Sequence, residues 1–423
     1  MGRRRSAGKP PAPKRTRGHP ESPDFSGVQN SPARAFIGFV KSLLPPVLAL
    51  FASVALSASA AGADAEGFVP LFNGRDLTGW VNANCAPETW SVRDGVIHCT
   101  GLPIGGLRTT RHYENFILEL EWRHLKRSGN SGVFVWGSPI NAPGVPFLRG
   151  IEVQALDHGY AEDFEKKNGK KSDWFTVHGD VFAIHGATMN YIGKTNGKRS
   201  FPIEDRSKRS PEWNHYRIVA NNGSLRLHVN GKEVSGGNDA NYRKGYLALE
   251  SEGSPVEFRN IRLKELPSTG AGPEVTAPLD LGWRALFNAL DLRGWKTNAA
   301  TAASWGIGNG RITLKAAGGP EATLWTDRDY GAAEFIVDYQ PPKSGGAEVA
   351  TVMIRGQSVK LAGAEAGKFS RFVITAQGEK IRVQRDAAAP VETALPAGAP
   401  VRAPFGLSAT GPGAYTNLHA RDL

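Results

Sequence analysis

The chain has 423 residues, 40% of them hydrophobic and 22% charged, so it can build more than one packed core and is not disordered throughout. Its 50 Gly and 28 Pro favour many short strands over a helical bundle, and its two Cys exclude a disulfide-rich scaffold or a multi-Cys zinc module. The net charge of +11 comes mostly from residues 1–41, which contribute +7. No basic stripe with interleaved aromatic residues occurs further on, which argues against a nucleic-acid partner.

The N-terminus has the composition of an export signal. Residues 1–41 form a basic tail, rich in Pro, Arg and Ser, that we expect to be disordered. Residues 42–63 carry no charge and end in small residues of the A-x-A type, as a cleaved secretory signal does. The alternative is a retained membrane anchor, because about 20 apolar residues can span a bilayer. Either way we expect the folded part to be extracytoplasmic: periplasmic, at the cell surface or secreted.

The two cysteines flank the first predicted hairpin, which covers residues 90–98 and turns at Asp94-Gly95. A disulfide between Cys85 and Cys99 would close a loop of 15 residues and contribute about 3 kcal/mol if unstrained. An extracytoplasmic compartment would preserve that bond. The alternative is two buried free thiols.

Short stretches of alternating polar and apolar residues predict strands along most of the remaining chain. The clearest lie at residues 116–123, 130–136, 151–155, 213–220, 225–230, 246–249 and 256–263. The polar residues 161–171 predict one helical turn or a loop. Long helical periodicity is absent, so the pattern predicts an all-β fold of the β-sandwich type.

The chain contains one domain twice. Residues 67–80 and 282–295 share eight of fourteen positions, and similar segments recur further along both copies. The spacing between matching segments falls from 219 to 157, so the second copy lacks a long internal segment, which we place at roughly 137–210 of the first. The sequence therefore predicts a first β-sandwich at 66–267, a linker at 268–279 and a shorter, degenerate second β-sandwich at 280–423.

Six motifs occur in order in the first copy: LFNGRDLTGW at 71–80, NSGVF at 130–134, GIEVQ at 150–154, EWN at 212–214, VNG at 229–231 and VEFRNI at 256–261. In this combination the first copy, over residues 66–267, resembles the 3-keto-disaccharide hydrolase family (3-keto-glucoside 1,2-lyase or 3-keto-2-hydroxy-glucal hydratase domains). The second copy resembles it weakly. The resemblance implies two tandem concanavalin A-like jelly rolls in an exported bacterial protein.

The same resemblance implies net hydrolysis of glycosides already oxidised to a ketone at C3, through elimination to a 3-keto-2-hydroxyglucal and hydration. A ketone at C3 acidifies the proton on C2, so the reaction needs a base, a donor to the enolate oxygen, and an acid or metal near the leaving group. The expected substrate is therefore a saccharide, specifically a 3-keto-glycoside.

The segment missing from the second copy holds the candidate catalytic residues. Glu152 lies in an alternating strand whose odd-numbered residues suit a core, so Glu152 and Gln154 share the other face. We predict Glu152 as the base and Arg149 or His185 as the enolate stabiliser. If the segment is only a set of longer loops, its loss from the second copy says nothing about catalysis.

The predicted substrate-binding residues lie on and beside this face: Asn130, Ser131, Phe134, Trp136, Gln154 and Asp157. Amide side chains suit sugar hydroxyls, and aromatic rings suit the C–H face of a sugar. Asn130, Phe134 and Trp136 share one face if their strand is regular. The alternative for the polar residues is an ordinary solvated surface.

Other functions stay open at this point. An ordinary glycosidase needs two carboxylates on one face, whereas Glu152 and Asp157 lie on opposite faces of a regular strand. Glu119 and Glu121 share a face, but such faces are usually only solvated. A divalent metal beside Asp157 is possible in principle, yet no metal ligand and no cofactor is predicted. The main alternative to an enzyme is a non-catalytic carbohydrate-binding surface protein.

Overall fold

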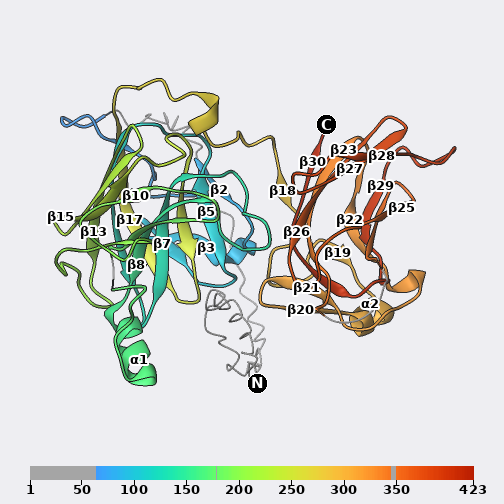
Figure 1. Cartoon of the computed structure of the whole chain (residues 1–423), viewed down its shortest axis with the longest axis horizontal. Coiled ribbons are helices and arrows are strands. Elements are labelled where there is room, and N and C mark those ends of the chain that lie inside the picture. Colours follow the sequence, from blue (N-terminus) through green and yellow to red (C-terminus); the bar gives the residue numbers. More distant parts are fainter. Residues whose placement is uncertain (1–62, 178, 344–348) are drawn as a thin grey trace, which may run out of the picture. The chain divides into compact units, whose positions relative to one another are not determined.

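Two β-sandwiches follow one another along the chain in the computed structural model (Figure 1). The structure describes residues 63–177, 179–343 and 349–423. The predicted basic tail and the uncharged segment 42–63, except for Ala63, lie outside these residues. Within the described ranges, no helix is both long and apolar enough to cross a bilayer.

The larger sheet of the first sandwich, called the back sheet here, has nine strands. Every pairing in it is antiparallel, and β1 (Val69–Pro70) pairs with β17. The other strands run in the order β10 (Asn190–Tyr191), β15 (Lys232–Asn238), β14 (Ser224–Val229), β13 (Asn214–Asn221), β6 (Phe116–His124), β17 (Val256–Glu265), β4 (Val96–Cys99) and β3 (Trp90–Arg93).

The opposing sheet, the front sheet, has eight strands and is also antiparallel. Its order is β11 (Lys194–Thr195), β12 (Ser200–Phe201), β9 (Val181–Ile184), β8 (Gly150–Leu156), β7 (Asn130–Gly137), β16 (Tyr246–Ser251), β5 (Gly105–Thr109) and β2 (Trp80–Asn82). The all-β prediction is confirmed.

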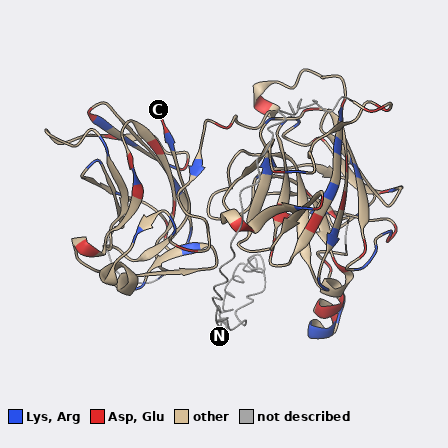
Figure 2. Ribbon diagram, turned by 180° about the vertical axis from the view of Figure 1, so that it is seen from behind, with Lys and Arg blue, Asp and Glu red and all other residues tan. Residues whose placement is uncertain are grey.

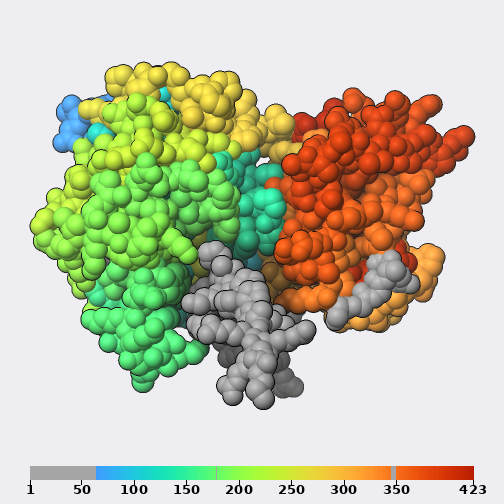
Figure 3. Space-filling view, in the orientation of Figure 1, coloured from blue at the N-terminus to red at the C-terminus, as the bar shows by residue number. Residues whose placement is uncertain are grey.

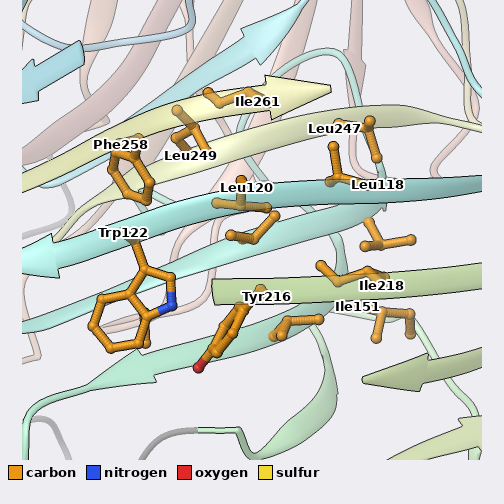
Figure 4. Packing of buried hydrophobic residues seen from close by; sticks show 14 of the residues in the cluster. Leu118, Leu120, Trp122, Ile151, Tyr216, Ile218, Leu247, Leu249, Phe258 and Ile261 are labelled. Atoms are coloured by element: carbon orange, nitrogen blue, oxygen red, sulfur yellow. The ribbon is translucent and has the colours of Figure 1, made fainter. Parts of the chain in front are cut away.

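The hydrophobic core lies between the two sheets, as the alternation of the strands requires. Leu118 and Leu120 of β6 meet Ile151 of β8 there, and Trp122 packs edge-on against Tyr216 with ring centroids 5.3 Å apart (Figure 4). These side chains are all 2% exposed or less, so their burial is what fixes the register of both sheets.

The outer side of the back sheet carries ion pairs, and Figure 2 shows acidic and basic residues on neighbouring strands of the first sandwich. Glu119 accepts hydrogen bonds from Arg217 and Arg262, and Glu121 accepts one from Arg259. Their carboxylates are therefore held in ion pairs with neighbouring strands, and this face offers no free acid–base pair among the described residues.

A helix extends beyond the end of the first sandwich, where the sequence predicted only one helical turn or a loop (Figures 1 and 3). Helix α1 (His158–Asn168) has 11 residues. Asp157 caps its start by accepting from the backbone N–H of Gly159, and Gly169 ends it in the left-handed region at φ 69°. These two capping residues set the ends of the helix. A search for apolar periodicity does not detect a helix that is polar on most faces.

The second sandwich is smaller. Its back sheet runs β20 (Trp305–Gly308), β21 (Arg311–Leu314), β30 (Gly413–Asp422), β23 (Ala333–Gln340), β26 (Ser370–Gln377), β27 (Lys380–Arg385) and β28 (Val391–Ala394), and β18 (Arg284–Ala285) pairs with β30. Its front sheet runs β19 (Trp295–Lys296), β22 (Leu324–Tyr330), β29 (Ala403–Leu407), β24 (Thr351–Ile354) and β25 (Gln357–Lys360). The remaining helices are α2 (Ala299–Ser304) and three 3-10 turns at Pro87–Thr89, Pro273–Val275 and Pro320–Ala322.

The strand registers of the two front sheets match around one central leucine in each sheet. In the first, Leu249 pairs with Leu107 and Val133, and in the second Leu407 pairs with Leu324 and Val352. The second front sheet therefore has counterparts of β2, β5, β16, β7 and β8, and no described strand replaces β9, β11 or β12. The segment missing from the second copy therefore begins later than the predicted residue 137, because β25 of the second copy corresponds to β8.

The predicted first hairpin is confirmed, but the predicted disulfide is not formed. Strands β3 and β4 pair around Asp94 and Gly95, both at positive φ as a tight hairpin turn requires. Cys85 and Cys99 are buried free thiols. The Cys85 Sγ lies 3.7 Å from the carbonyl oxygen of Pro103, and the Cys99 Sγ accepts from the backbone of Gly101, so each sulfur has a local partner.

Candidate active site

Glu152 and Gln154 lie on the outer side of the front sheet, as predicted. Their neighbours Ile151, Val153 and Ala155 all belong to the core between the sheets. Glu152 and Gln154 are each 6% exposed, so other parts of the chain cover this outer side and keep most water away from both.

A second carboxylate reaches the same place from β16. A Cβ atom added to Gly132 would lie 2.9 Å from Glu152 Oε1 and 3.1 Å from Glu250 Oε2. The two oxygens therefore approach one point from opposite sides, above a residue without a side chain. On the other edge of β16, Glu250 pairs with Gly106 of β5, so Glu250 has a glycine on each neighbouring strand.

Glu252 completes what we call the carboxylate cluster: Glu152, Glu250 and Glu252. Asn130 donates from Nδ2 to Glu252 Oε2, and a further hydrogen bond joins the Glu250 and Glu252 side chains. Glu250 Oε2 is buried and has no hydrogen-bond partner among the described residues. One carboxyl oxygen in the cluster is thus left for a ligand.

Arg199 supplies the positive charge beside the cluster. Its Nη1 donates to Gln154 Oε1 at 2.7 Å and lies 3.4 Å from Asp180 Oδ2. Gln154 extends this hydrogen-bond network, because its Nε2 donates to Asn130 Oδ1 at 3.1 Å. The polar side chains of two strands, β7 and β8, and of Arg199 just before β12 are therefore ordered in one row.

Aromatic rings surround the Arg199 guanidinium. It lies 3.5 Å from the ring centroid of Phe182 and 5.0 Å from that of Trp174. Trp174 belongs to the segment that follows α1, and its ring meets Phe175 edge-on at 4.6 Å. Its side of the site is open, because Trp174 is 41% exposed.

Burial raises the pKa of every member of the carboxylate cluster. The pKa of Glu152 rises to about 8 through burial and the nearby charge of Glu252, although Arg199 opposes the rise. Burial likewise takes the pKa of Glu252 to about 7, and burial with the charges of the other two takes that of Glu250 well above its usual range. Since the three titrate together, at neutral pH the cluster holds protons that ordinary glutamates would have lost.

The connection between β7 and β8 covers the rest of this outer side. Leu148 packs there against Phe134, Ala83 and Ala248. Phe134 is on the predicted face but is only 1% exposed, so it forms part of this small core. It is not the open aromatic wall that the sequence predicted.

The predictions for Trp136 and Ser131 placed both on or beside this face and are wrong. Trp136 has φ 52° at an irregularity between β7 and β16, which turns its ring into the core, where its indole N–H donates to the Glu114 carbonyl. Ser131 points inward by simple alternation and donates to the backbone carbonyl of Glu250.

Arg149 and His185 do not meet Glu152, so neither takes the role predicted for it. The Arg149 guanidinium lies 3.5 Å from the ring centroid of Tyr242, and His185 stacks on Phe147. The charge that acts on Glu152 comes from Arg199. Arg149 stands just before the start of β8, so the alternation of that strand does not place its side chain beside Glu152.

Asp157 has a structural role. It accepts backbone N–H groups of Ser128, Gly159 and Ser210, which caps α1 and ties down two loops. These donors lower its pKa. Asp157 is thus committed to the backbone rather than to a ligand. Among the described residues, no group of three or more His, Cys, Asp or Glu side chains is placed to hold a metal.

Three members of the site were not predicted from the sequence: Glu250, Glu252 and Arg199. The two glutamates continue the alternation of the strand predicted at 246–249, a range that ends too early. Arg199 follows a turn in which Asn196 Oδ1 accepts the backbone N–H groups of Lys198 and Arg199. Only the folded chain reveals where that turn lies.

The second front sheet carries no carboxylate at the corresponding positions. By register, Ser358 and Lys360 replace Glu152 and Gln154, since Val359 pairs with Val352 as Val153 does with Val133. Ser408 and Thr410 follow Leu407 as Glu250 and Glu252 follow Leu249. The cluster is therefore specific to the first sandwich.

A family model and one relative point to the same family. The model for the 3-keto-alpha-glucoside-1,2-lyase-like domain matches residues 67–264 and 282–397. A 3-keto-disaccharide hydrolase of Bacteroides thetaiotaomicron is 22% identical over 261 residues, covering 48% of this chain and 80% of its own length.

Solved structures of similar fold also match part of the chain. One, from Parabacteroides distasonis and named as a candidate glycosyl hydrolase, is 24% identical and covers 48% of this chain and 96% of its own, with a TM-score of 0.38. Another, the carbohydrate-binding module CBM66 of Bacillus subtilis, is 12% identical and covers 44% of this chain and 96% of its own, with a TM-score of 0.31.

Proposed function

Because the chain belongs to the family of 3-keto-alpha-glucoside-1,2-lyase-like domains, we propose that its first sandwich cleaves glycosides whose sugar carries a ketone at C3. The observation that carries the proposal is the buried carboxylate cluster, in which the carboxyl groups of Glu152 and Glu250 face each other above Gly132. The relative from Bacteroides thetaiotaomicron, named for hydrolysis of 3-keto-disaccharides, supports the same substrate class.

In the proposed reaction, ionised Glu152 removes the proton from C2. The electron pair moves onto the C3 oxygen, where the positive charge of Arg199 stabilises the enolate. When the enolate collapses, the C3 carbonyl re-forms, a double bond forms between C1 and C2, and the bond from C1 to the glycosidic oxygen breaks. Protonated Glu250 donates a proton to that leaving oxygen.

Water then adds to the unsaturated sugar. Its oxygen bonds to C1 and a proton returns to C2, so one water is consumed and the products are a 3-keto sugar and the free alcohol. The raised pKa of Glu152 suits this sequence, because a carboxylate with a pKa of about 8 is a stronger base than an ordinary glutamate.

The test uses the full chain with a 3-keto-glucoside and its parent glucoside, in D₂O. We expect release of alcohol from the 3-keto-glucoside alone, with deuterium at C2 of the product. Glu152→Gln should abolish release, while Glu233→Gln, an exposed glutamate on β15, should not change it. Release with no deuterium at C2 contradicts the elimination.

An ordinary glycosidase is the second candidate. The distances of 2.9 Å and 3.1 Å from the two carboxylate oxygens to one point above Gly132 permit the separation of roughly 5–5.5 Å that retaining enzymes use. Release of alcohol from the parent glucoside would favour this reading. Inertness toward both substrates would favour a binding protein.

We also propose that the protein works outside the cytoplasm, on the basis of the uncharged residues 42–63 with their small-residue end. N-terminal sequencing of the exported protein should find a start near residue 64. Recovery of the intact chain in the membrane fraction would favour the anchor, and recovery in the cytoplasm would contradict export.

A further inference from the structure

The outer side of the second front sheet holds an aromatic residue and hydroxyl groups in the places where the first has its cluster and its neighbours. The register equates Trp325 with Arg108 and Gly406 with Ala248, since Trp325 pairs with Gly406 as Arg108 pairs with Ala248. Leu324, the preceding residue of β22, belongs to the second hydrophobic core. Because successive side chains of a strand point to opposite faces, the Trp325 indole faces outward.

The Trp325 indole lies against a glycine backbone. A Cβ atom added to Gly406 would lie 2.7 Å from Cε3 and 2.8 Å from Cζ3 of the ring. The ring therefore occupies the space that a side chain at 406 would take, and Trp325 is still only half-buried. Part of its apolar surface remains open to solvent on a sheet face.

Hydroxyl groups line the next row. Thr410 Oγ1 lies 3.2 Å from Thr351 Oγ1 and 3.0 Å from Ser408 Oγ, so the three form one hydrogen-bonded group. Ser358 and Lys360 of β25 are exposed beside it. On the other side of Trp325, the exposed Lys296 is its partner in β19.

We propose that this face is a second, non-catalytic saccharide-binding site. The open part of this half-buried indole offers the apolar surface on which a pyranose ring stacks its C–H groups, and hydroxyl and ammonium groups donate to sugar oxygens. Carboxylates are absent from these described positions, because Ser358, Ser408 and Thr410 replace Glu152, Glu250 and Glu252. The site would hold one unit of a glycan chain while the first sandwich acts on its own substrate.

The test is electrophoresis of the full chain through native gels containing soluble β-glucan, dextran, mannan or polygalacturonate. We expect at least one of the four to retard the wild type, and Trp325→Ala to weaken that retardation about tenfold, as the loss of one stacked ring does. Gly406→Val should weaken it similarly by displacing the ring. Trp325→Phe should retain part of it.

The controls separate this proposal from the proposed function. Trp213→Ala removes a half-buried ring that lies just before β13 of the first sandwich and packs against Arg123, and it should leave retardation unchanged. Glu152→Gln should also leave it unchanged, since binding does not need turnover. Melting temperatures verify that each variant is folded. Equal migration of wild type and Trp325→Ala in all four gels overturns the proposal, whatever the activity of the first sandwich.

Discussion

Glu152 and Glu250 approach each other over Gly132, from the two strands that flank it. An oxygen of each lies close to the point where a Cβ of residue 132 would be, at 2.9 Å and 3.1 Å, so no side chain separates the two carboxyl groups there. Neither strand carries this arrangement alone. It exists because β8 and β16 pair with opposite edges of β7.

Gly132→Ala should therefore damage the site more than the fold. The new methyl would stand 2.9 Å from Glu152 and 3.1 Å from Glu250, so both carboxylates must move. We expect kcat/KM for a 3-keto-glucoside to fall at least tenfold, with a small change in melting temperature. Gly106→Ala is the matched control, since its methyl meets only the Leu249 carbonyl at 3.6 Å. Equal loss in both variants would show that the spacing over Gly132 is irrelevant.

The stability of the protein should depend on pH through Glu152. Its pKa in the folded state is about 8, above the usual value of 4.5, so folding favours the protonated form. That contribution is complete below about pH 4.5 and is lost as the pH rises through 8. Glu152→Gln should accordingly gain stability relative to wild type between pH 5 and pH 8.5. A difference of about 1 kcal/mol corresponds to about 2–4 °C in melting temperature. The same difference at both pH values would contradict the assigned burial.

Removal of the Arg199 charge should shift the pH dependence of activity. Arg199 lowers the pKa of Glu152 and of Glu252, so Arg199→Met should raise both. If ionised Glu152 is the base, the rising limb of kcat/KM against pH should move to higher pH. Arg199→Lys keeps a positive charge and should move it less. If the rising limb of kcat/KM against pH does not move in Arg199→Met, Arg199 does not influence the pKa of the catalytic base.

Trp174 should affect substrate binding more than turnover. It is the exposed ring beside Arg199 and so is available to the part of the substrate beyond the 3-keto ring. Trp174→Ala should raise KM for a 3-keto-disaccharide several-fold and change KM for a methyl 3-keto-glucoside little. Similar KM changes for both substrates would place the ring elsewhere in the mechanism.

The two cysteines should be unreactive in the native protein. Burial raises the pKa of Cys85 to about 12 and that of Cys99 to about 11, so almost no thiolate exists at pH 8. A thiol reagent should therefore detect none before denaturation and two per chain after it. Failure to find two thiols in the denatured, non-reduced protein would instead indicate the disulfide.

Sequence alternation is sufficient to place Glu152, Gln154 and Asn130, because a strand with one face in a core leaves its other face determined. It fails for Trp136 because one residue with positive φ reverses the pattern, and no propensity marks a tryptophan for that conformation. The fold can also be predicted, because turn residues are local signals and because the repeat is visible when the two copies are compared.

The partners of Glu152 could not be predicted in the same way. Glu250 stands 98 positions away in the sequence and Arg199 stands 47 away, so both depend on which strands and turns become neighbours. Arg149 is nearer along the chain, and proximity in sequence favours it, but the tertiary pairing decides the contact.

The connection between β7 and β8, which covers the outer side of the first front sheet, has a consequence for protein design. Glutamates introduced at positions 358, 408 and 410 of the second sheet would stand in the same strand register as the natural three, yet Ser358 and Thr410 are exposed there. Water would solvate such glutamates and leave them as common acids with a pKa of about 4.3. To raise the pKa of the new glutamates, the second sandwich would therefore need the covering segment as well as the acids, because that separate stretch of chain excludes water from the site.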